Sequence, residues 1–332
     1  MSRAFEALAG QTVAVTGANG FLGGHLIEAL SAAGAQPRAL VRNARPGLFA
    51  PAVQVRAVAY DQPESLDAAL GGVDALVHAA GGGKVGDVEG FYRANRDTTV
   101  QLLEASQRVV PNLGRFVLIS SAAAHGPATL GRASLESDPP QPGSHYGKSK
   151  RAAEEAALSV KDRLPVSILR PPAVYGPADT RMLGLFAAVQ RRLLPKIGKG
   201  ETSMVYVEDC VQAILRAICT PHLSGRIYFV CDGQAYSHQR IGEAIEAALG
   251  TQALRIPVPA WLLKTVGAAS ERFAQATGRT TFLTSDKVAD LLQPSWVLNP
   301  GLIQDELGFE AQTLFEQGAL HTARWYRDQG WI

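Results

Sequence analysis

The sequence predicts an α/β protein in which a doubly wound parallel sheet carries a smaller, mostly helical C-terminal lobe. Two observations lead to this fold class. Short apolar runs alternate with helical patterns up to residue 170, and beyond residue 177 the pattern is less regular and mainly helical. Strands that alternate with helices in this way form parallel sheets with helices on both faces. The 332 residues are enough to bury a large core.

The expected strands are short runs of β-branched and apolar residues bounded by glycine or polar residues. They cover residues 12–15, 37–41, 53–58, 74–78, 116–121 and 166–170. The helical spacing of apolar residues predicts helices at 21–34, from Pro63, at 88–107 and from Tyr146. Ligands of such sheets bind at the carboxyl ends of the strands, so the residues that follow each strand are candidates for a site.

Composition argues for a small-molecule partner. The formal net charge is +2, and no cluster of Lys and Arg is interleaved with aromatic residues, so we expect no nucleic acid partner. No apolar run is long enough for an integral membrane segment or a signal peptide. The three cysteines form no C-x-x-C pair and the seven histidines no H-x-x-x-H pair, so we expect no metal and a cytoplasmic location with reduced thiols.

A glycine-rich turn links the first strand to the first helix. Its three glycines, Gly17, Gly20 and Gly23, are spaced by three, and the helix begins near Phe21. A helix N-terminus behind bare backbone is an anion site suited to a pyrophosphate. The spacing departs from G-x-G-x-x-G, and a purely structural turn is the alternative. The cofactor contacts expected here are Gly17, Asn19, Gly20, Phe21, Leu22 and Gly23.

The end of the second strand indicates which dinucleotide is bound. An acidic residue there would accept the ribose 2′-hydroxyl of NAD, whereas an arginine would pair with the 2′-phosphate of NADP. Residues 40–50 contain no Asp or Glu, and Arg42 stands at the strand end. This favours NADP, with NAD possible, and a solvated loop residue is the alternative for Arg42. Asp61 could accept a hydrogen bond from the adenine amino group or cap a helix.

The proline-rich segment 171–177 cannot continue a sheet and marks the exit into a second region. We expect an NADP-binding domain over residues 1–176. Residues 202–233 are expected to return to it, because 204–207 and 226–230 look like strands around a helix at 208–219. The substrate-binding lobe would then comprise 177–201 and 234–332, with helices at 241–249, 260–276, 285–291 and 313–327.

Three polar residues form a candidate proton-transfer set. Tyr146 and Lys150 are four residues apart, so they share one helix face, and Ser121 ends the fifth expected strand. A cation beside a phenol lowers its pKa, so Lys150 could tune Tyr146 and also bind the cofactor ribose. Tyr146 could then exchange a proton with a substrate oxygen that Ser121 holds. A surface helix pair is the ordinary alternative for a Tyr-x-x-x-Lys sequence.

Several segments together carry a family resemblance: residues 16–23, 77–80, Asn95, 119–121, 146–150 and 170–177. With them the chain resembles, over nearly its whole length, an extended short-chain dehydrogenase/reductase of the NAD(P)-dependent epimerase/dehydratase group. The resemblance implies a Rossmann-type fold, catalysis by Ser121, Tyr146 and Lys150, and a homodimer formed through the helices near 90–107 and 146–160. It also places the nicotinamide near Pro171, Ala173 and Val174. The glycine-containing segment after the fourth strand adds Ala79, Ala80 and Gly81 to the cofactor contacts, and His78 before it is expected to be a packed strand residue.

Within the group, the C-terminal half is most similar to 3β-hydroxysteroid dehydrogenase-like and dihydroflavonol reductase-like members, on residues 204–209, 307–309 and 324–331. Two places depart from the wider pattern: His125 stands where tyrosine is usual, and residues 202–205 lack an Arg-Asp-aromatic run. We therefore expect an oxidoreductase that acts on a fairly apolar secondary alcohol or ketone. The apolar segment 255–266 could be a lid, a packed helix or a membrane-surface contact.

Two other functions remain open. The first is a nucleotide-sugar epimerase or dehydratase, for which a diphosphate-binding group of basic residues would be needed. Its candidates are Arg181, Arg191, Arg192, Arg272 and Arg279. The second is a non-catalytic NADP-binding sensor, against which the complete Ser–Tyr–Lys set argues.

Overall fold

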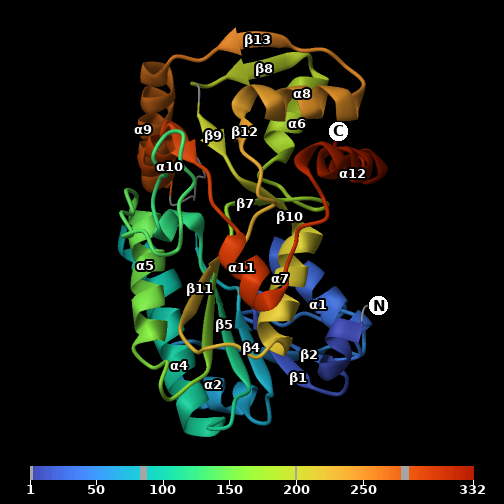
Figure 1. Cartoon of the computed structure of the whole chain (residues 1–332), viewed down its shortest axis with the longest axis vertical. Coiled ribbons are helices and arrows are strands. Elements are labelled where there is room, and N and C mark those ends of the chain that lie inside the picture. Colours follow the sequence, from blue (N-terminus) through green and yellow to red (C-terminus); the bar gives the residue numbers. More distant parts are fainter. Residues whose placement is uncertain (1–2, 83–87, 199, 278–283) are drawn as a thin grey trace.

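The computed structural model describes residues 3–82, 88–198, 200–277 and 284–332. Its centre is a seven-stranded sheet with the order β11-β6-β5-β4-β1-β2-β3, in which every neighbouring pair is parallel (Figure 1). The strands are β1 Thr12–Thr16, β2 Gln36–Val41, β3 Gln54–Ala57, β4 Ala75–His78, β5 Arg115–Ile119, β6 Val166–Arg170 and β11 Arg226–Phe229. The order reverses between β1 and β4, and a crevice at such a reversal is where ligands of these sheets bind.

Helices cover both faces of this sheet, as Figure 1 shows. The helices that flank it are α1 Phe21–Ala32, α2 Pro63–Leu70, α3 Val88–Tyr92, α4 Thr98–Val109, α5 His145–Leu158 and α7 Val207–Cys219. One apolar core joins the sheet to α1 and α7, and a second core joins its other face to α2, α4 and α5. The predicted doubly wound α/β fold is confirmed.

The C-terminal lobe has small sheets and its own core. Its helices are α6 Leu183–Gln190, α8 His238–Leu249, α9 Ala260–Thr277, α10 Ser285–Leu291, α11 Gly301–Leu307 and α12 Phe315–Asp328. The short strands of the chain are β7 Ala173–Tyr175 with β10 Met204–Tyr206, β8 Leu193–Lys196 with β13 Leu254–Pro257, and β12 Tyr236–Ser237, β9 Glu201–Thr202 and β14 Ser295–Trp296. A third core packs α6, α8 and α12 together, whereas α11 packs on the sheet domain.

The expected helix at 88–107 differs from the observed one. The structure has α3, then a π-helical turn at Arg93–Asp97 (η2), then α4. Two 3₁₀ turns, η1 Arg3–Leu8 and η3 Ala122–Ala124, complete the helices. The proline-rich segment leaves the main sheet as expected, but it also forms β7, whose partner β10 lies far along the chain.

No helix in the described part of the chain is long and apolar enough to cross a bilayer. The cysteines are free thiols: Cys210 and Cys231 are buried and Cys219 is half-buried.

Candidate active site

The glycine turn after β1 is shaped by its lack of side chains. Gly17 has a φ of +66°, and a Cβ there would lie 2.8 Å from the Ala80 nitrogen. A Cβ at Gly23 would overlap the Gly17 carbonyl oxygen. Gly20 is the N-cap of α1, and no side chain of the described residues caps this end. The first turn of α1 therefore presents backbone N–H groups and its positive dipole end, which suits a pyrophosphate.

The segment after β4 lies beside this turn and is held by polar contacts. The Ala80 N–H donates to Thr16 Oγ1 over 3.1 Å, and Thr16 Oγ1 is 2.7 Å from His78 Nδ1. Burial lowers the pKa of His78 to about 3, so its imidazole is neutral and structural. A Cβ at Gly81 would lie 2.7 Å from both Asn95 Oδ1 and Lys150 Nζ, so this backbone passes directly over the proposed reaction centre.

Tyr146 lies in the first turn of α5, which Ser144 caps by accepting the Gly147 N–H over 3.2 Å. The Ser121 hydroxyl lies beside the Tyr146 phenol, where it acts to lower the phenol's pKa. Ser121 Oγ also accepts the Ala123 N–H over 3.2 Å, which fixes its position at the start of η3. The structure thus brings together a hydroxyl and a phenol that lie 25 residues apart, at the carboxyl edge of the sheet.

Lys150 lies one turn further along α5 and is almost completely buried. Its Nζ donates to the Ile119 carbonyl over 3.0 Å. Burial lowers its pKa to about 8, and the nearby Glu154 carboxylate works in the opposite direction. Since four residues make about one helical turn, Tyr146, Lys150 and Glu154 share one face of α5.

The pKa of Tyr146 is raised, not lowered as the sequence analysis expected. Burial is the largest cause, and the Ser121 hydroxyl and the charge of Arg181 only partly offset it. The Lys150 ammonium does not lower the phenol's pKa here, because its hydrogen bond to the Ile119 carbonyl directs it elsewhere. Tyr146 is therefore a neutral phenol in this structure.

A buried ion pair beneath the site escaped the sequence analysis. Arg170 binds Glu154 in a bidentate manner, with N–O distances of 2.8 and 2.6 Å, and both side chains are at most 1% exposed. Ser120 Oγ donates to Glu154 Oε1 over 2.6 Å. The pair ties α5 to the ends of β5 and β6. Its sequence signal was the position of Glu154 four residues after Lys150.

Asn95 explains the π-helical turn. Its Nδ2 donates to Ser149 Oγ over 2.9 Å, and its Oδ1 accepts the Gly82 N–H over 3.1 Å. Ser149 Oγ in turn donates to the Tyr146 carbonyl over 2.8 Å. π-Turns inside α-helices often occur at functional sites, and this one turns Asn95 towards the segment after β4 and towards α5.

The segment from Pro171 to Arg181 closes the site from the other side. The Pro171 carbonyl accepts the Ala122 N–H over 2.9 Å; Val174 is buried and Ala173 exposed. The Arg181 guanidinium lies 5.5 Å from the centre of the Phe21 ring and donates to the Val174 carbonyl over 3.3 Å. This cation therefore bridges the glycine turn and the segment expected to line the nicotinamide.

The helix α10 approaches the same place. The His145 N–H, at the start of α5, donates to Asp286 Oδ2 over 2.5 Å. Asp290 of α10 lies near Tyr146, and its charge acts to raise the pKa of Tyr146. The substrate lobe thus contributes acidic groups beside the phenol.

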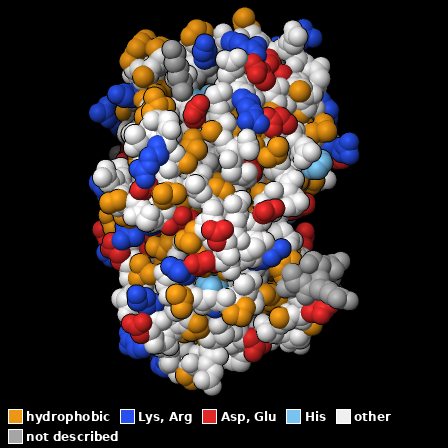
Figure 2. Space-filling model, in the orientation of Figure 1, with side chains coloured by type: hydrophobic (Ala, Val, Ile, Leu, Met, Phe, Trp, Pro, Cys, Tyr) orange, Lys and Arg blue, Asp and Glu red, His pale blue; other side chains and the backbone are white. Residues whose placement is uncertain are grey.

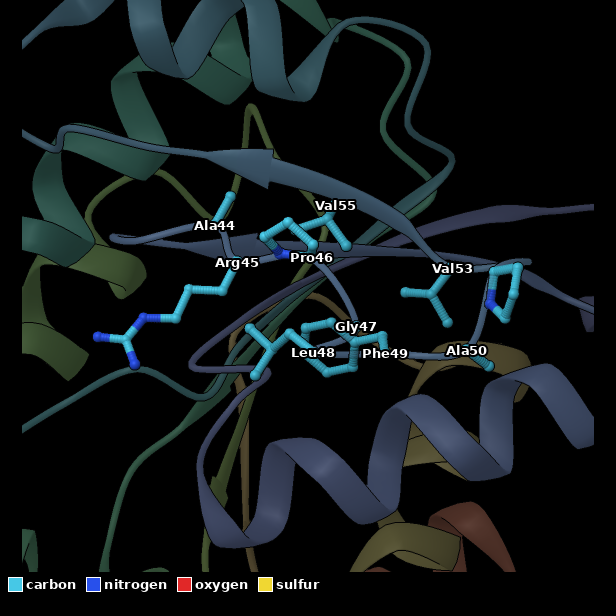
Figure 3. Close-up of a pocket in the computed structure, with 10 residues that line it drawn as sticks. Ala44, Arg45, Pro46, Gly47, Leu48, Phe49, Ala50, Val53 and Val55 are labelled. Atoms are coloured by element: carbon cyan, nitrogen blue, oxygen red, sulfur yellow. The ribbon is translucent and has the colours of Figure 1, made fainter.

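The remaining predicted cofactor contacts lie along the same edge. Asn19, Gly20, Phe21 and Leu22 form the turn and first residues of α1. Arg42 follows β2 and is exposed, and its charge acts on the pKa of Tyr60. Asp61 is exposed after β3. Near Arg42, residues 44–55 enclose an open hollow of about 380 Å³ (Figure 3), lined by Leu48 and Phe49 among others; none of its lining residues belongs to the predicted site.

The described basic residues among those proposed for a diphosphate do not converge. Of these described residues, Arg181 alone approaches Tyr146 closely enough to influence its pKa. Arg191 and Arg192 follow α6, and Arg272 lies on α9; all three are exposed at the outer part of the lobe. Arg279 and Gly83 lie outside the described residues.

Comparison with known proteins identifies the class to which this fold and site belong. The model of the NAD dependent epimerase/dehydratase family matches residues 13–231, so the chain belongs to this family. Its enzymes act on CH–OH or keto groups with a nicotinamide dinucleotide, and the expected resemblance is confirmed.

Among individual proteins, the chain is 32% identical to ceramide reductase of Caulobacter vibrioides over 327 residues, covering 96% of each chain. It is 27% identical to 2-alkyl-3-oxoalkanoate reductase of Stenotrophomonas maltophilia, covering 92% of this chain and 96% of the relative. The solved dTDP-glucose 4,6-dehydratase of Streptomyces venezuelae shares the fold, with a TM-score of 0.77, 23% identity, and coverage of 97% of this chain and 98% of that one.

Proposed function

We propose that this protein is an NADPH-dependent reductase of a ketone on an apolar, lipid-like substrate. The observation that carries the proposal is the placement of the Ser121 hydroxyl beside the Tyr146 phenol and the buried Lys150, at the carboxyl edge of the sheet. Two relatives, named for ceramide and for 2-alkyl-3-oxoalkanoate, are reductases of lipid substrates, which supports the apolar class.

The residues divide the work of ketone reduction as follows. The bound nicotinamide supplies the hydride. Ser121 Oγ holds the carbonyl oxygen by a hydrogen bond, and Tyr146 donates the proton that this oxygen takes up. Lys150 Nζ donates to the Ile119 carbonyl in the present structure. We infer that its ammonium turns towards the ribose and the phenol when the cofactor binds, and that its charge then stabilises the phenolate that proton donation leaves. Because burial raises the pKa of Tyr146, the phenol is protonated at neutral pH, which favours proton donation and hence reduction.

The preference for NADP rests on Arg42. Its guanidinium is exposed at the end of β2, and no acidic residue lies within residues 40–50 to accept a ribose hydroxyl. A charge-assisted pair with the 2′-phosphate would contribute about 1.5–3 kcal/mol, or roughly 10- to 150-fold in affinity.

Fluorescence titration with NADPH and NADH tests this preference on wild type, Arg42→Ala and Arg45→Ala. Arg45, drawn in Figure 3, is exposed three residues further along the same loop and is the matched arginine. We expect Arg42→Ala to weaken NADPH at least tenfold and to leave NADH unchanged, with Arg45→Ala close to wild type. Equal affinities for both cofactors, insensitive to Arg42→Ala, would refute the NADP assignment.

The substrate class is tested by NADPH consumption with two panels of ketones. One contains 3-oxo acyl compounds and oxidised long-chain lipids in detergent, and the other contains dTDP-4-keto-sugars. We expect turnover with the first panel that disappears in Tyr146→Phe. Turnover confined to the sugars would instead support the epimerase or dehydratase alternative, which the family membership keeps open. Binding of NADPH without turnover of either panel would favour the sensor.

We also infer a homodimer and a division into residues 1–176 with 202–233, and 177–201 with 234–332. The pairing of β11 with β6 supports the return of the middle segment to the sheet domain. Sedimentation velocity and limited proteolysis test the two inferences.

A further inference from the structure

The outer end of the C-terminal lobe carries a two-stranded ribbon with one open apolar face. β8 and β13 pair in parallel, with Leu193 opposite Leu254 and Pro195 opposite Ile256. Alternate residues of a strand point to opposite faces, so these four share a face. The other face packs inward: Leu194 is buried, and Arg255 reaches back to Glu246 of α8 over 2.9 Å. Leu193, Leu254 and Ile256 are between 41% and 69% exposed.

The helix α9 follows β13 after a two-residue link, and it also exposes large apolar side chains. Only a narrow stripe of its described side chains packs inward, through Gly267 and Ala274, which lie seven residues apart. Trp261 and Phe273 are 67% and 62% exposed, and Leu262 and Val266 are exposed as well. At 100° per residue, Leu262, Val266 and Phe273 fall within an arc of about 40° on the helix. Such a concentration of large apolar side chains on the surface marks an interaction site.

We call residues 191–198 and 251–277 the lobe-end surface. These segments contain Arg191, Arg192, Lys196, Arg255, Lys264 and Arg272, against a single acidic residue, Glu271. Their formal charge is therefore +5, and +4 remains when the ion pair of Arg255 with Glu246 of α8 is counted. Figure 2 shows hydrophobic and basic side chains, with some acidic ones between them, at the end of the molecule where Figure 1 places β8, β13 and α9.

We propose that the lobe-end surface docks onto the head-group layer of a lipid bilayer that contains anionic lipids. Large apolar side chains, tryptophan among them, enter the boundary between head groups and acyl chains, and basic residues around them pair with anionic lipids. A second copy of this chain fits the surface poorly, because an isologous contact would bring two positively charged surfaces together. The bilayer offers both the apolar layer and the negative charge.

This inference stands apart from the proposed reaction, because docking is measured without substrate or cofactor. The full chain is co-sedimented with vesicles of phosphatidylcholine alone and of phosphatidylcholine mixed with phosphatidylglycerol. We expect binding to the mixed vesicles at least tenfold stronger than to the neutral ones, weakening as salt is raised, with a blue shift of tryptophan emission on binding.

Two variants separate the apolar and basic contributions. Trp261→Ala with Phe273→Ala should reduce binding to the mixed vesicles at least tenfold, and Lys264→Glu with Arg272→Glu should abolish the preference for anionic lipid. The control is Leu130→Ala with Leu223→Ala, which removes two side chains of similar exposure, 64% and 69%, elsewhere on the surface. Circular dichroism and NADPH affinity, which depends on a remote part of the chain, verify that each variant is folded.

Two results would overturn the proposal. One is a lack of binding to either vesicle by the folded wild type, or binding that the lobe-end variants do not change. The other is a dimer in vesicle-free sedimentation velocity that the Trp261→Ala, Phe273→Ala variant dissociates, because the surface would then be a contact between copies of the chain.

Discussion

The carboxyl edge of the seven-stranded sheet and the lobe-end surface depart from ordinary protein surfaces in opposite ways. At the sheet edge, charged side chains are buried: Lys150 is 5% exposed and Glu154 and Arg170 are fully buried. At the lobe end, Trp261 and Phe273 stand mostly in solvent. Burying a charge and exposing a large apolar side chain both reduce the stability of the folded protein. Each arrangement therefore indicates that the region serves a function. The first fits proton transfer in a closed site, and the second fits contact with something outside the molecule.

The largest effect should follow from removing one oxygen atom at the sheet edge. Tyr146→Phe keeps the ring contact with Phe91 but loses the proton donor, so we expect kcat/KM for ketone reduction to fall by about 10²- to 10⁴-fold. NADPH affinity should change little. Steady-state kinetics with Tyr92→Phe as the control provides the measurement. Near wild-type turnover of Tyr146→Phe would contradict proton donation by Tyr146, and with it our functional explanation for the buried charges at the sheet edge.

The next effect concerns the ion pair beneath the site. Glu154→Gln leaves the Arg170 guanidinium buried without its anionic partner, so we expect the free energy of unfolding to fall by about 3–5 kcal/mol. Glu155→Gln, at the neighbouring position, removes only an exposed pair with Arg151 and should cost less than about 1 kcal/mol. Urea unfolding measures both. An equal decrease in the free energy of unfolding for both variants would mean that the buried ion pair stabilises the protein no more than the exposed one.

The same contrast explains how far the sequence could predict the structure. Strand–helix alternation and the glycines after β1 were readable because each depends on local spacing, and the fold and family followed. The π-turn could not be predicted from local spacing, because it depends on hydrogen bonds of the Asn95 side chain with Gly82 and Ser149. The strand β7 was missed for the same reason, since its partner is distant in sequence.

At the site, the residue types of Ser121, Tyr146 and Lys150 suggested a proton-transfer set, and their roles stay predictions. The direction of the Tyr146 pKa shift was wrong, because it depends on burial and on where Lys150 Nζ points. Glu154 was missed because an acidic residue in a helix is usually solvated, and only the tertiary structure pairs it with Arg170.

A smaller effect tests the close approach at the glycine turn. Gly17→Ala combines a positive φ with a Cβ only 2.8 Å from the Ala80 nitrogen, so we expect about 3 kcal/mol of destabilisation and weakened cofactor binding. Gly10→Ala is the matched control, because its φ of +76° is similar but no atom lies within 4 Å. It should cost about 1 kcal/mol and leave NADPH affinity unchanged. Similar losses in both variants would attribute the effect to φ alone.

The mildest test is pH, and it separates the two regions within one protein. Burial lowers the pKa of Lys150 to about 8, so the ammonium needed in the reaction is lost as pH rises through that value. We expect kcat/KM for reduction to be level below about 8 and to fall about tenfold per pH unit above it. Vesicle binding should persist to higher pH, because the guanidinium groups of the lobe-end arginines are not deprotonated in proteins. Two variants test whether Lys150 sets the pH at which kcat/KM begins to fall.

Lys148 is exposed on the same helix, so Lys148→Met should leave the pH profile unchanged. Glu154→Gln removes the carboxylate that raises the pKa of Lys150, so in the folded variant kcat/KM should begin to fall at a lower pH. A profile that stays level up to pH 10 would show that the buried ammonium at the sheet edge takes no part in the reaction.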